Sequence, residues 1–487
     1  MIENIKLRKS ILYIFLITAI GAVFRIYHLG FKPLWLDEAV IYWISESGSI
    51  KEIITQNALR NSTPPLFPIL ISFITTLSDS EEFLRLISVL AGIASIPAIY
   101  FFARELINKY PALILTVLVS VAPTQIKYSQ EVREYSLTFL LTILILLFFV
   151  RYLKQLKVKD LIMMTIFMII GILTQYGLSL LIIGLNIIYL YYLIFSKEKQ
   201  KERLLRWISS QALTLGAAIF VLLVSLRGQS RFFAASGSSS HYLYNAYWNG
   251  TVRGLYIFAF KNTYELFKFA FSSNMFIALT IIGFIFLIIN IKKLSTPFLL
   301  FTVPMTITFF LAVLGFYPYH GDRQDIFLTP MIYMLAGFGI NHLWNLDKKR
   351  WTAIILFSLP IIAGIVQSWN YLNFPGAENI IPIVEKLQES INEDDHIYVY
   401  YGAKPAFDYY YRDYDEVKIS YGTSNRGEVN EYYKEIDNLF GQGNPVWFVF
   451  SHCWQNECNL IKNHISKNYN GEIIVKENNA FLLYGNQ

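Results

Sequence analysis

Long apolar runs are the feature that most restricts how this chain can fold. Hydrophobic residues make up 54% of its 487 residues, and several runs are long enough to cross about 30 Å of hydrocarbon as helices. Since backbone polar groups inside a bilayer must be satisfied internally, the sequence predicts a polytopic α-helical membrane protein. We expect about eleven transmembrane helices, at residues 10–28, 83–103, 111–127, 135–150, 160–175, 178–195, 207–226, 274–290, 297–316, 326–345 and 351–371.

The distribution of Lys and Arg predicts the orientation of these helices. The N-terminus and the loops on its side hold 19 Lys or Arg in 47 residues, whereas the loops on the other side hold 10 in 119. Cytoplasmic loops collect basic residues. We therefore expect an integral protein of the plasma membrane with a cytoplasmic N-terminus. An odd number of spans then places the C-terminus outside.

The apolar segment from Pro64 to Ser78 is too short for a further span. It begins with two prolines, and counting it as a span would place Asp37 and Glu131 on opposite sides of the membrane. We therefore expect interfacial or re-entrant helices within an outer loop at 29–82.

The composition changes near Asn373, where the long apolar runs end. Residues 372–487 carry 9 Lys or Arg against 17 Asp or Glu, a net charge of −8. The sequence thus predicts a transmembrane catalytic domain at 1–372 and a soluble extracytoplasmic α/β domain at 373–487. Three short strand-like pieces support the second domain, at 396–401, 417–421 and 446–450.

Cys453 and Cys458 are the only cysteines of the chain. In an extracytoplasmic domain they could form a disulfide across a short loop, and two unpaired thiols are the alternative. A metal site is less well supported, because His452 is the only other nearby ligand of a suitable type.

Two adjacent acids, Asp37 and Glu38, follow the first span almost at once. Carboxylates held at a membrane face usually serve a chemical role. A purely structural interpretation is that Asp37 caps a helix on the membrane surface and interacts with its dipole.

Two further outer loops carry both acids and arginine. The second loop contains Glu131, Arg133 and Glu134, and a later loop contains Asp322 and Arg323. Such loops are often merely solvated. Acids and arginines at one face nevertheless suit a reaction with a lipid-borne phosphate leaving group, because arginine binds phosphate bidentately while a carboxylate removes the acceptor proton.

The order of these motifs resembles that of a known family. The resemblance covers about residues 8–155 and is carried by Leu36-Asp37-Glu38-Ala39, Pro64-Pro65-Leu66-Phe67, Arg85-Leu86 and the segment Tyr128–Tyr135. This succession is similar to the family 39 type of integral-membrane glycosyltransferases of the GT-C superfamily. That group includes the protein O-mannosyltransferases and the aminoarabinose transferases of lipid A.

The resemblance implies an extracytoplasmic hexosyltransferase, with mannosyl transfer as one option. It would take a sugar from a polyprenyl-phosphate donor and deliver it to a lipid, glycan or protein acceptor of the cell envelope. Membrane lipids are further expected partners, and nucleic acid is not expected. The implied roles are general base for Asp37 with Glu38 beside it, a second-loop acid for Glu131 with Arg133 and Tyr135 as neighbours, and donor-phosphate binding for Arg323, with Asp322 and His320 near it.

The sequence departs from that of the family in two places, which argues against acceptor and donor contacts identical to those of the family. Thr63 stands where the aminoarabinose transferases carry a basic residue before the two prolines. Residues 372–487 are also too short for the β-trefoil domain of the eukaryotic O-mannosyltransferases. Glycolipid or cell-envelope glycan synthesis is therefore at least as well supported as protein O-mannosylation.

Several alternatives stay open at this point. A Mg²⁺ or Mn²⁺ ion could bridge Asp37, Glu131 and the phosphate, or arginine could neutralise the phosphate instead. The chain could also be a transporter or flippase for lipid-linked sugars, or a sensor whose C-terminal domain binds a ligand. The long outer loop at 227–273 is either a lid with sugar-stacking aromatics or a linker with interfacial ones, and its relevant residues are Ser236–Ser240, Tyr242, Tyr244, Tyr247 and Trp248.

Overall fold

The computed structural model divides into two compact units. The first unit comprises Met1–Tyr27, Ser47–Ser78 and Phe83–Leu372, and the second comprises His28–Glu46, Asp79–Glu82 and Asn373–Gln487. The C-terminal residues thus form one unit with two short pieces of the first loop. The structure describes residues 2–195, 200–226, 228–229, 243–346, 351–392, 394–412, 417–426, 428–441 and 443–486.

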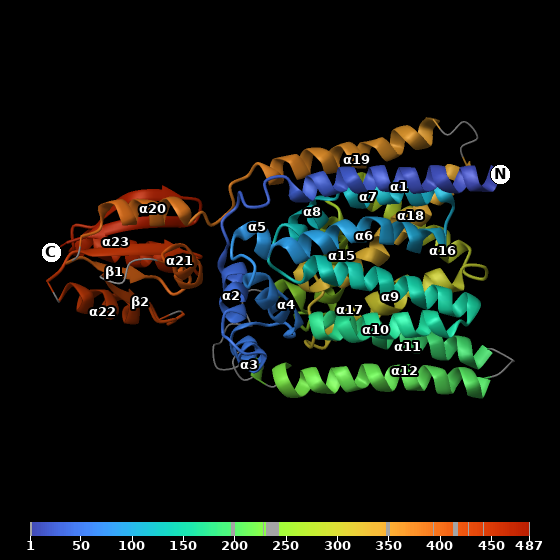
Figure 1. Ribbon diagram of the computed structural model, residues 1–487, viewed down its shortest axis with the longest axis horizontal. Coiled ribbons are helices and arrows are strands. Elements are labelled where there is room, and N and C mark those ends of the chain that lie inside the picture. Colours follow the sequence, from blue (N-terminus) through green and yellow to red (C-terminus); the bar gives the residue numbers. More distant parts are fainter. Residues whose placement is uncertain are drawn as a thin grey trace. The chain divides into compact units, whose positions relative to one another are not determined.

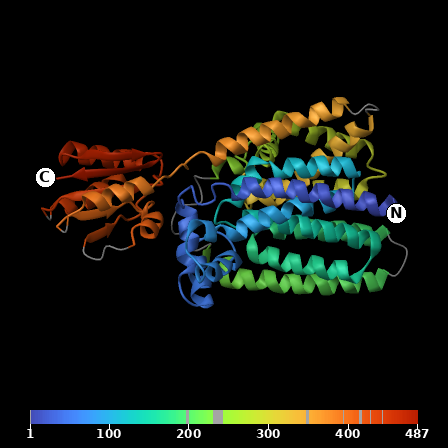
Figure 2. The same ribbon diagram turned by 45° about the horizontal axis from the view of Figure 1, so that its top comes forward.

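The first unit is helical throughout its described part. Its long helices run side by side, as α1, α6, α9 and α10 show in both views (Figures 1 and 2). The α-helices are α1 (Ile2–Ile26), α3 (Ile50–Arg60), α4 (Leu66–Thr75), α6 (Leu86–Arg104), α7 (Lys109–Ser120), α8 (Pro123–Ser129), α9 (Tyr135–Gln155), α10 (Val158–Thr174), α11 (Gly177–Phe195), α12 (Gln200–Val221), α15 (Val252–Ala270), α16 (Asn274–Ile289), α17 (Ser295–Val313), α18 (Thr329–Leu346) and α19 (Trp351–Leu372). Three shorter helical segments are η1 (Leu222–Leu226), η2 (Tyr244–Ala246) and η3 (Arg323–Leu328), and α5 (Glu81–Leu84) lies at the boundary of the two units.

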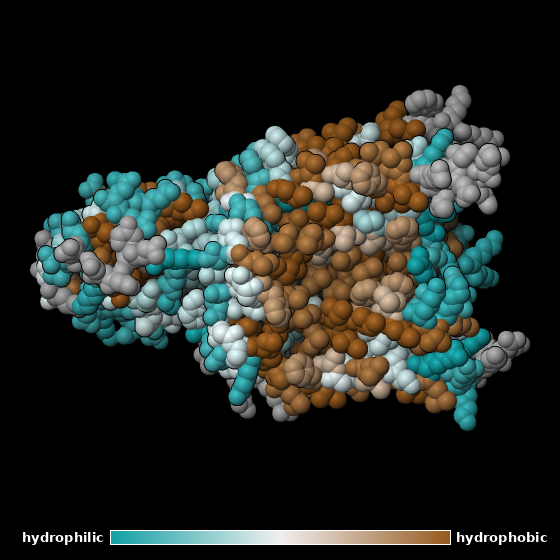
Figure 3. Space-filling model, in the orientation of Figure 1, coloured by the Kyte–Doolittle hydropathy of each residue, from teal (hydrophilic) through white to brown (hydrophobic). Residues whose placement is uncertain are grey.

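These helices confirm a polytopic membrane protein. Within the described residues, eight helices are long and apolar enough to cross a membrane, or up to ten if the bent pairs α7–α8 and α15–α16 each count as one span. The predicted segments coincide with these helices, and the segment at 111–127 coincides with the bent pair α7–α8. The predicted span at 160–175 corresponds to α10, whose 17 residues are too few for it to be counted among the eight to ten spans. Apolar residues cover the middle of the first unit in Figure 3, and hydrophilic residues gather at the helix ends.

The bend between α7 and α8 explains why one basic residue is buried. The two helix axes differ by 53°, and Pro123, which opens α8, has no backbone N–H to continue the helical ladder. Arg25 is fully buried, and its guanidinium donates to the carbonyls of Ser120 at 2.9 Å and Val119 at 3.3 Å. Arg25 thereby satisfies carbonyls next to the break and fixes where the chain enters the second loop.

The apolar segment after Pro65 forms the short helix α4. Its ten residues extend about 15 Å, only half of the hydrocarbon thickness. The structure therefore agrees that this segment is not a span of its own, while its interfacial position stays a prediction.

The second unit contains a five-stranded sheet with the order β2-β1-β3-β5-β4. Strands β1 (His396–Val399), β2 (Lys418–Tyr421) and β3 (Val446–Ser451) are parallel and coincide with the three predicted pieces. Strands β4 (Glu472–Glu477) and β5 (Ala480–Gly485) add an antiparallel edge. The helices of this unit are α2 (Leu36–Ser45), α20 (Ile381–Ser390), α21 (Lys404–Tyr410), α22 (Val429–Phe440) and α23 (Glu457–Asn468).

The β4–β5 hairpin of this sheet domain was not predicted from the sequence, whereas a disulfide was one of two alternatives. The β4–β5 hairpin turns at Asn478-Asn479, where Asn479 has a φ of 50°, a conformation that asparagine tolerates well. Cys453 and Cys458 form a disulfide, with their Cα atoms 5.7 Å apart. Of the two alternatives, a disulfide or two unpaired thiols, the structure contains the disulfide.

Candidate active site

The second loop connects α8 to α9 and is tied to neighbouring helices through its backbone and amide groups. Gln130 donates from Nε2 to the carbonyls of Tyr27 at 2.7 Å and Arg25 at 3.3 Å. The Ser88 hydroxyl of α6 donates to the carbonyl of Arg133 at 2.9 Å. The loop is therefore fixed by the end of α1 and by α6.

The charged side chains of this loop are buried. Glu131 is 7% exposed and lies 3.8 Å from the ammonium of Lys127, one helical turn before it. Arg133 is 4% exposed, and its Nε lies 3.4 Å from a carboxylate oxygen of Glu134, whose side chain is fully buried. Buried charges are costly unless paired, so their retention here favours a functional site over a solvated turn.

Tyr128 lies where the second loop meets the loop that precedes α18. Its ring packs edge-on against Tyr135, with centroids 4.7 Å apart. The loop before α18 reaches the same region, because η3, which begins at Arg323, packs against α9, which begins at Tyr135. Two loops that are nearly 200 positions apart in the sequence are therefore neighbours in the fold. Arg133 also contacts Tyr135, because its guanidinium lies 5.3 Å from the centre of the Tyr135 ring.

The loop before α18 is organised by Asp325, which the sequence analysis missed. One of its carboxylate oxygens accepts hydrogen bonds from the backbone N–H groups of His320 at 3.0 Å and Gly321 at 2.9 Å. Asp322 caps η3 by accepting from the N–H of Arg323 at 2.7 Å. Asp325 thus shapes the turn that presents Asp322 and Arg323. The spacing of Asp322 and Asp325 was a signal that could have identified it, because a polar residue followed by an acid three positions later is typical of a helix start.

Gly321 allows this turn to form. Its φ is +80°, and an added Cβ would lie 2.5 Å from the carbonyl oxygen of Glu265. From the other side, Gln175 donates to the carbonyl of Arg323 at 3.2 Å, and the Tyr317 hydroxyl donates to that of Gln324 at 2.8 Å. The backbone around Arg323 is therefore held from several directions.

Asp37 and Glu38 lie in the second unit, in the first turn of α2. The N-cap residue is Trp35, so the interpretation of Asp37 as the cap itself is wrong. Both acids nevertheless lie where the helix dipole stabilises negative charge. Glu38 is 1% exposed, whereas Asp37 is half-buried and so is the more accessible of the two.

Part of the aromatic cluster in the long loop lines a cavity of about 430 Å³ together with Asn262 and Lys261 of α15. The loop is joined to the Arg323 loop, because Asn262 donates to the carbonyls of Asn245 and Tyr319, each at 2.8 Å. Burial, followed by the nearby Asp325 carboxyl, raises the pKa of Tyr247. Tyr244, Tyr247 and Trp248 line this cavity, while Ser236–Ser240 and Tyr242 lie outside the described residues.

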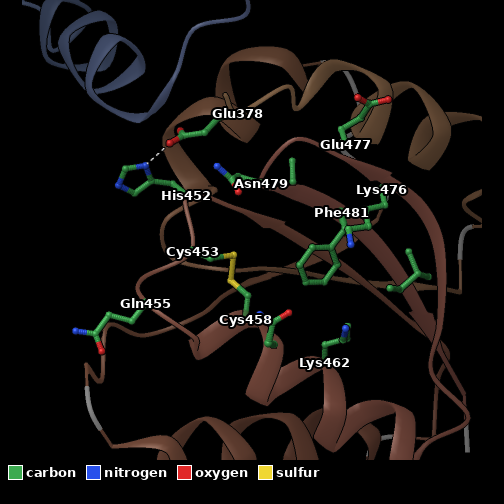
Figure 4. Close-up of a pocket in the computed structure, with 13 residues that line it drawn as sticks. Glu378, His452, Cys453, Gln455, Cys458, Lys462, Lys476, Glu477, Asn479 and Phe481 are labelled. Carbon is green, nitrogen blue, oxygen red and sulfur yellow. Dashed lines mark hydrogen bonds and ion pairs between the residues drawn. A yellow bond between two sulfur atoms is a disulfide. The ribbon is translucent and has the colours of Figure 1, made fainter. Parts of the chain in front are cut away.

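A second cavity, of about 390 Å³, lies in the sheet domain (Figure 4). At one end His452 is hydrogen-bonded to Glu378 at 2.7 Å, and the ring of Phe481 lies beside the disulfide. The cavity contains none of the predicted site residues.

No group of three or more His, Cys, Asp or Glu side chains that could hold a metal ion occurs among the residues that the structure describes. A divalent cation at Asp37 and Glu131 stays a prediction.

Comparison with known proteins agrees with this architecture. Residues 62–226 match the sequence model of a family described as dolichyl-phosphate-mannose-protein mannosyltransferase. No curated protein sequence matches the chain.

Solved structures match nearly the whole chain. ArnT from Cupriavidus metallidurans in the apo state is 12% identical, with a TM-score of 0.58 over 97% of each chain. The same protein bound to undecaprenyl phosphate has the same identity and coverage and a TM-score of 0.56. The oligosaccharyltransferase of Archaeoglobus fulgidus in its apo form is 11% identical, with a TM-score of 0.57 over 98% of this chain and 74% of its own. The chain thus has the fold of the GT-C integral-membrane glycosyltransferases, and its residues 62–226 match the dolichyl-phosphate-mannose-protein mannosyltransferase family.

Proposed function

We propose that this protein transfers a sugar from a polyprenyl-phosphate donor to an acceptor of the cell envelope, on the extracytoplasmic face of the membrane. The observation that carries the proposal is the packing of η3, which begins at Arg323 directly after Asp322, against α9, which follows the buried charges Glu131 and Arg133, within a GT-C fold. Acids beside arginine suit a reaction in which a phosphate departs and a hydroxyl loses its proton.

The proposed reaction is a single inverting displacement. Asp37 accepts the proton of the acceptor hydroxyl while that oxygen forms a bond to the anomeric carbon of the sugar. The bond from this carbon to the phosphate oxygen breaks on the opposite face, and the lipid phosphate leaves with the electron pair. Asp37 is assigned the base because it is more exposed than Glu38 and lies at a helix N-terminus that stabilises its charged form.

The other charged residues receive supporting roles. Arg323 binds the donor phosphate, and Arg133 adds positive charge as the phosphate leaves. Glu131 and Glu38 orient the acceptor and stabilise the positive charge that develops on the sugar ring. Tyr135, Asp322 and His320 border the donor, and a Mg²⁺ or Mn²⁺ ion at Asp37 and Glu131 would stabilise charge on the phosphate.

The structural neighbours support the class of donor and acceptor. ArnT was solved with undecaprenyl phosphate, and the archaeal oligosaccharyltransferase was solved with dolichol-phosphate and, separately, with a tethered acceptor peptide. The family description names mannose. We therefore propose a hexose on a polyprenyl phosphate as the donor, and a glycolipid, glycan or protein as the acceptor.

The test is sugar transfer by the purified full-length protein. Polyprenyl phosphates that carry radiolabelled hexoses are mixed with the protein and a cell-envelope extract, and label in the acceptor fraction is counted. We expect transfer that depends on the lipid donor and falls strongly in Arg323→Ala. Movement of the labelled carrier across reconstituted vesicles, without transfer to any acceptor, would instead identify a flippase and overturn the proposal.

A further inference from the structure

The helix that carries Asp37 is held by residues of the C-terminal domain that lie more than 360 positions later in the sequence. Helix α2 and residues 79–82 belong to the same compact unit as the sheet. Helix α21, which follows β1, packs directly against α2. Helix α21 of the sheet domain therefore contacts the helix that carries the proposed base.

Tyr410 anchors the chain just before α2. Its hydroxyl accepts a hydrogen bond from the backbone N–H of Leu34 at 2.8 Å and donates one to the Glu81 carboxylate at 2.9 Å. One phenol thus bridges both first-loop pieces of the unit. Burial, followed by the charge of Glu81, raises the pKa of Tyr410, so its donor proton stays in place at neutral pH.

Tyr409 and Arg412 hold the same loop at a second point. The Tyr409 hydroxyl donates to the carbonyl of Asp79 at 2.6 Å, and Arg412 forms an ion pair with the Asp79 carboxylate. The ring of Tyr409 packs edge-on against Tyr42 of α2, with centroids 4.9 Å apart. The guanidinium of Arg412 lies 4.3 Å from the Tyr409 ring and 5.2 Å from the Tyr42 ring.

A third contact lies at the N-cap of α2. The ring of Trp35 lies 6.4 Å from that of His452, which is fixed by its hydrogen bond to Glu378. Residues on both sides of Asp37 in the sequence therefore contact the sheet domain: Leu34 and Trp35 before it, and Tyr42 after it. Since side chains that act in catalysis must be held to within about 0.5 Å, such contacts decide how well an acid on this helix is placed.

We propose that Tyr409, Tyr410 and Arg412 are positioning residues for sugar transfer. Through them the C-terminal domain sets the position of α2 and hence of the Asp37 carboxylate. This proposal rests on the proposed function. It gives the C-terminal domain a role within the reaction itself, in addition to any binding of ligands.

The experiment measures backbone amide exchange in residues 34–45 and transfer kinetics on the same full-length samples. Tyr410→Phe removes only the hydroxyl, so the ring and its packing remain. We expect exchange in this segment to rise roughly tenfold and kcat to fall by a similar factor, because a buried N–H and a carboxylate lose their partner. KM for the lipid donor should change by less than about twofold, since the phosphate site is left intact.

A charge swap keeps the test independent of simple misfolding. Asp79→Arg and Arg412→Asp should each raise exchange in residues 34–45 and lower kcat. The double variant restores an ion pair of reversed polarity and should recover most of both losses. Lys434→Ala is the matched control, because it breaks an exposed ion pair with Glu431 on α22 of the same domain and should alter neither quantity.

The outcomes separate the two proposals. Unchanged exchange in residues 34–45 in Tyr410→Phe and in both single charge variants would overturn the positioning role. Faster exchange with an unchanged kcat would overturn it as well. If the wild type transferred no sugar from any donor, the proposed function would fail, and the exchange measurements alone would still decide whether α21 holds α2.

Discussion

The two loops that carry the proposed acids are held in different ways. The second loop, with Glu131, is fixed by helices of its own membrane unit through Gln130 and through the hydroxyl of Ser88. The first loop, with Asp37, is fixed by the C-terminal domain through Tyr409, Tyr410 and Arg412. The loop of Glu131 is thus held by buried contacts within its own unit, while the loop of Asp37 is held by residues that are distant in the sequence. Changes to the helical core should therefore disturb the second loop, and changes to the sheet domain should disturb the first loop.

The largest effect in the second loop is expected from Glu131→Gln. The substitution preserves size and removes the charge that we assign to orienting the acceptor and stabilising the sugar ring. Transfer should fall by about 10²-fold, as expected for the loss of a charged group that acts on the transition state. Lys127→Met removes its 3.8 Å ion pair and should cost much less, because Lys127 is exposed. Equal losses of transfer in Glu131→Gln and Lys127→Met would show that Glu131 acts only through its ion pair with Lys127, and would contradict the role assigned to Glu131.

A smaller effect on stability should follow from Gly92→Ala in α6. A Cβ at this position would meet the Ser129 hydroxyl at 2.0 Å, and that hydroxyl is already bonded to the carbonyl of Gln125 at 2.6 Å. Overpacking here should lower the free energy of unfolding by about 1–3 kcal/mol and shift the second loop. Thermal unfolding in detergent and amide exchange in residues 128–135 would measure both effects.

Gly216→Ala is the matched control for that substitution. Among the residues that the structure describes, no atom outside the adjoining helix backbone lies within 4 Å of a Cβ at Gly216 of α12, and alanine favours a helix over glycine. We expect unchanged or slightly raised stability and unchanged exchange in the second loop. A destabilisation as large as that of Gly92→Ala would contradict the explanation by overpacking.

The smallest effect on transfer is expected from loss of the disulfide. Cys453 and Cys458 close a loop of only five positions, so replacing both by serine should lower the stability of the sheet domain by about 2 kcal/mol. Exchange should rise around α23 and β3. It should stay unchanged in residues 128–135, because the membrane unit holds that loop. A rise there would contradict the separation between the two kinds of support.

The sequence predicted the membrane part well because its determining signals are local. Apolar length predicted the helical segments, of which eight to ten are long and apolar enough to span a membrane in the described residues. The shortness of the apolar run from Pro64 to Ser78, which begins with two prolines, kept α4 from being counted as a span. The acids of the loops were also visible as charges between apolar runs. Their burial was not, because exposure depends on which helices surround a loop.

Long-range features were the ones that the sequence could not provide. Nothing near Arg25 indicates that it satisfies carbonyls of Val119 and Ser120, nearly a hundred positions away. The hairpin of β4 and β5 was missed because its turn is Asn-Asn rather than the stronger Asn-Gly signal. The contact of α21 with the first loop could not be predicted either, because it joins residues more than 300 positions apart in the sequence.

The most direct test of the account is the transfer rate of Asp37→Asn in a single turnover, measured beside the binding of the lipid donor. Asparagine keeps the size of the side chain but cannot accept the proton of the acceptor. We expect a rate about 10²–10⁴-fold below that of the wild type, with donor binding unchanged. A variant that binds the donor and transfers sugar at the wild-type rate would contradict the assignment of Asp37 as the base.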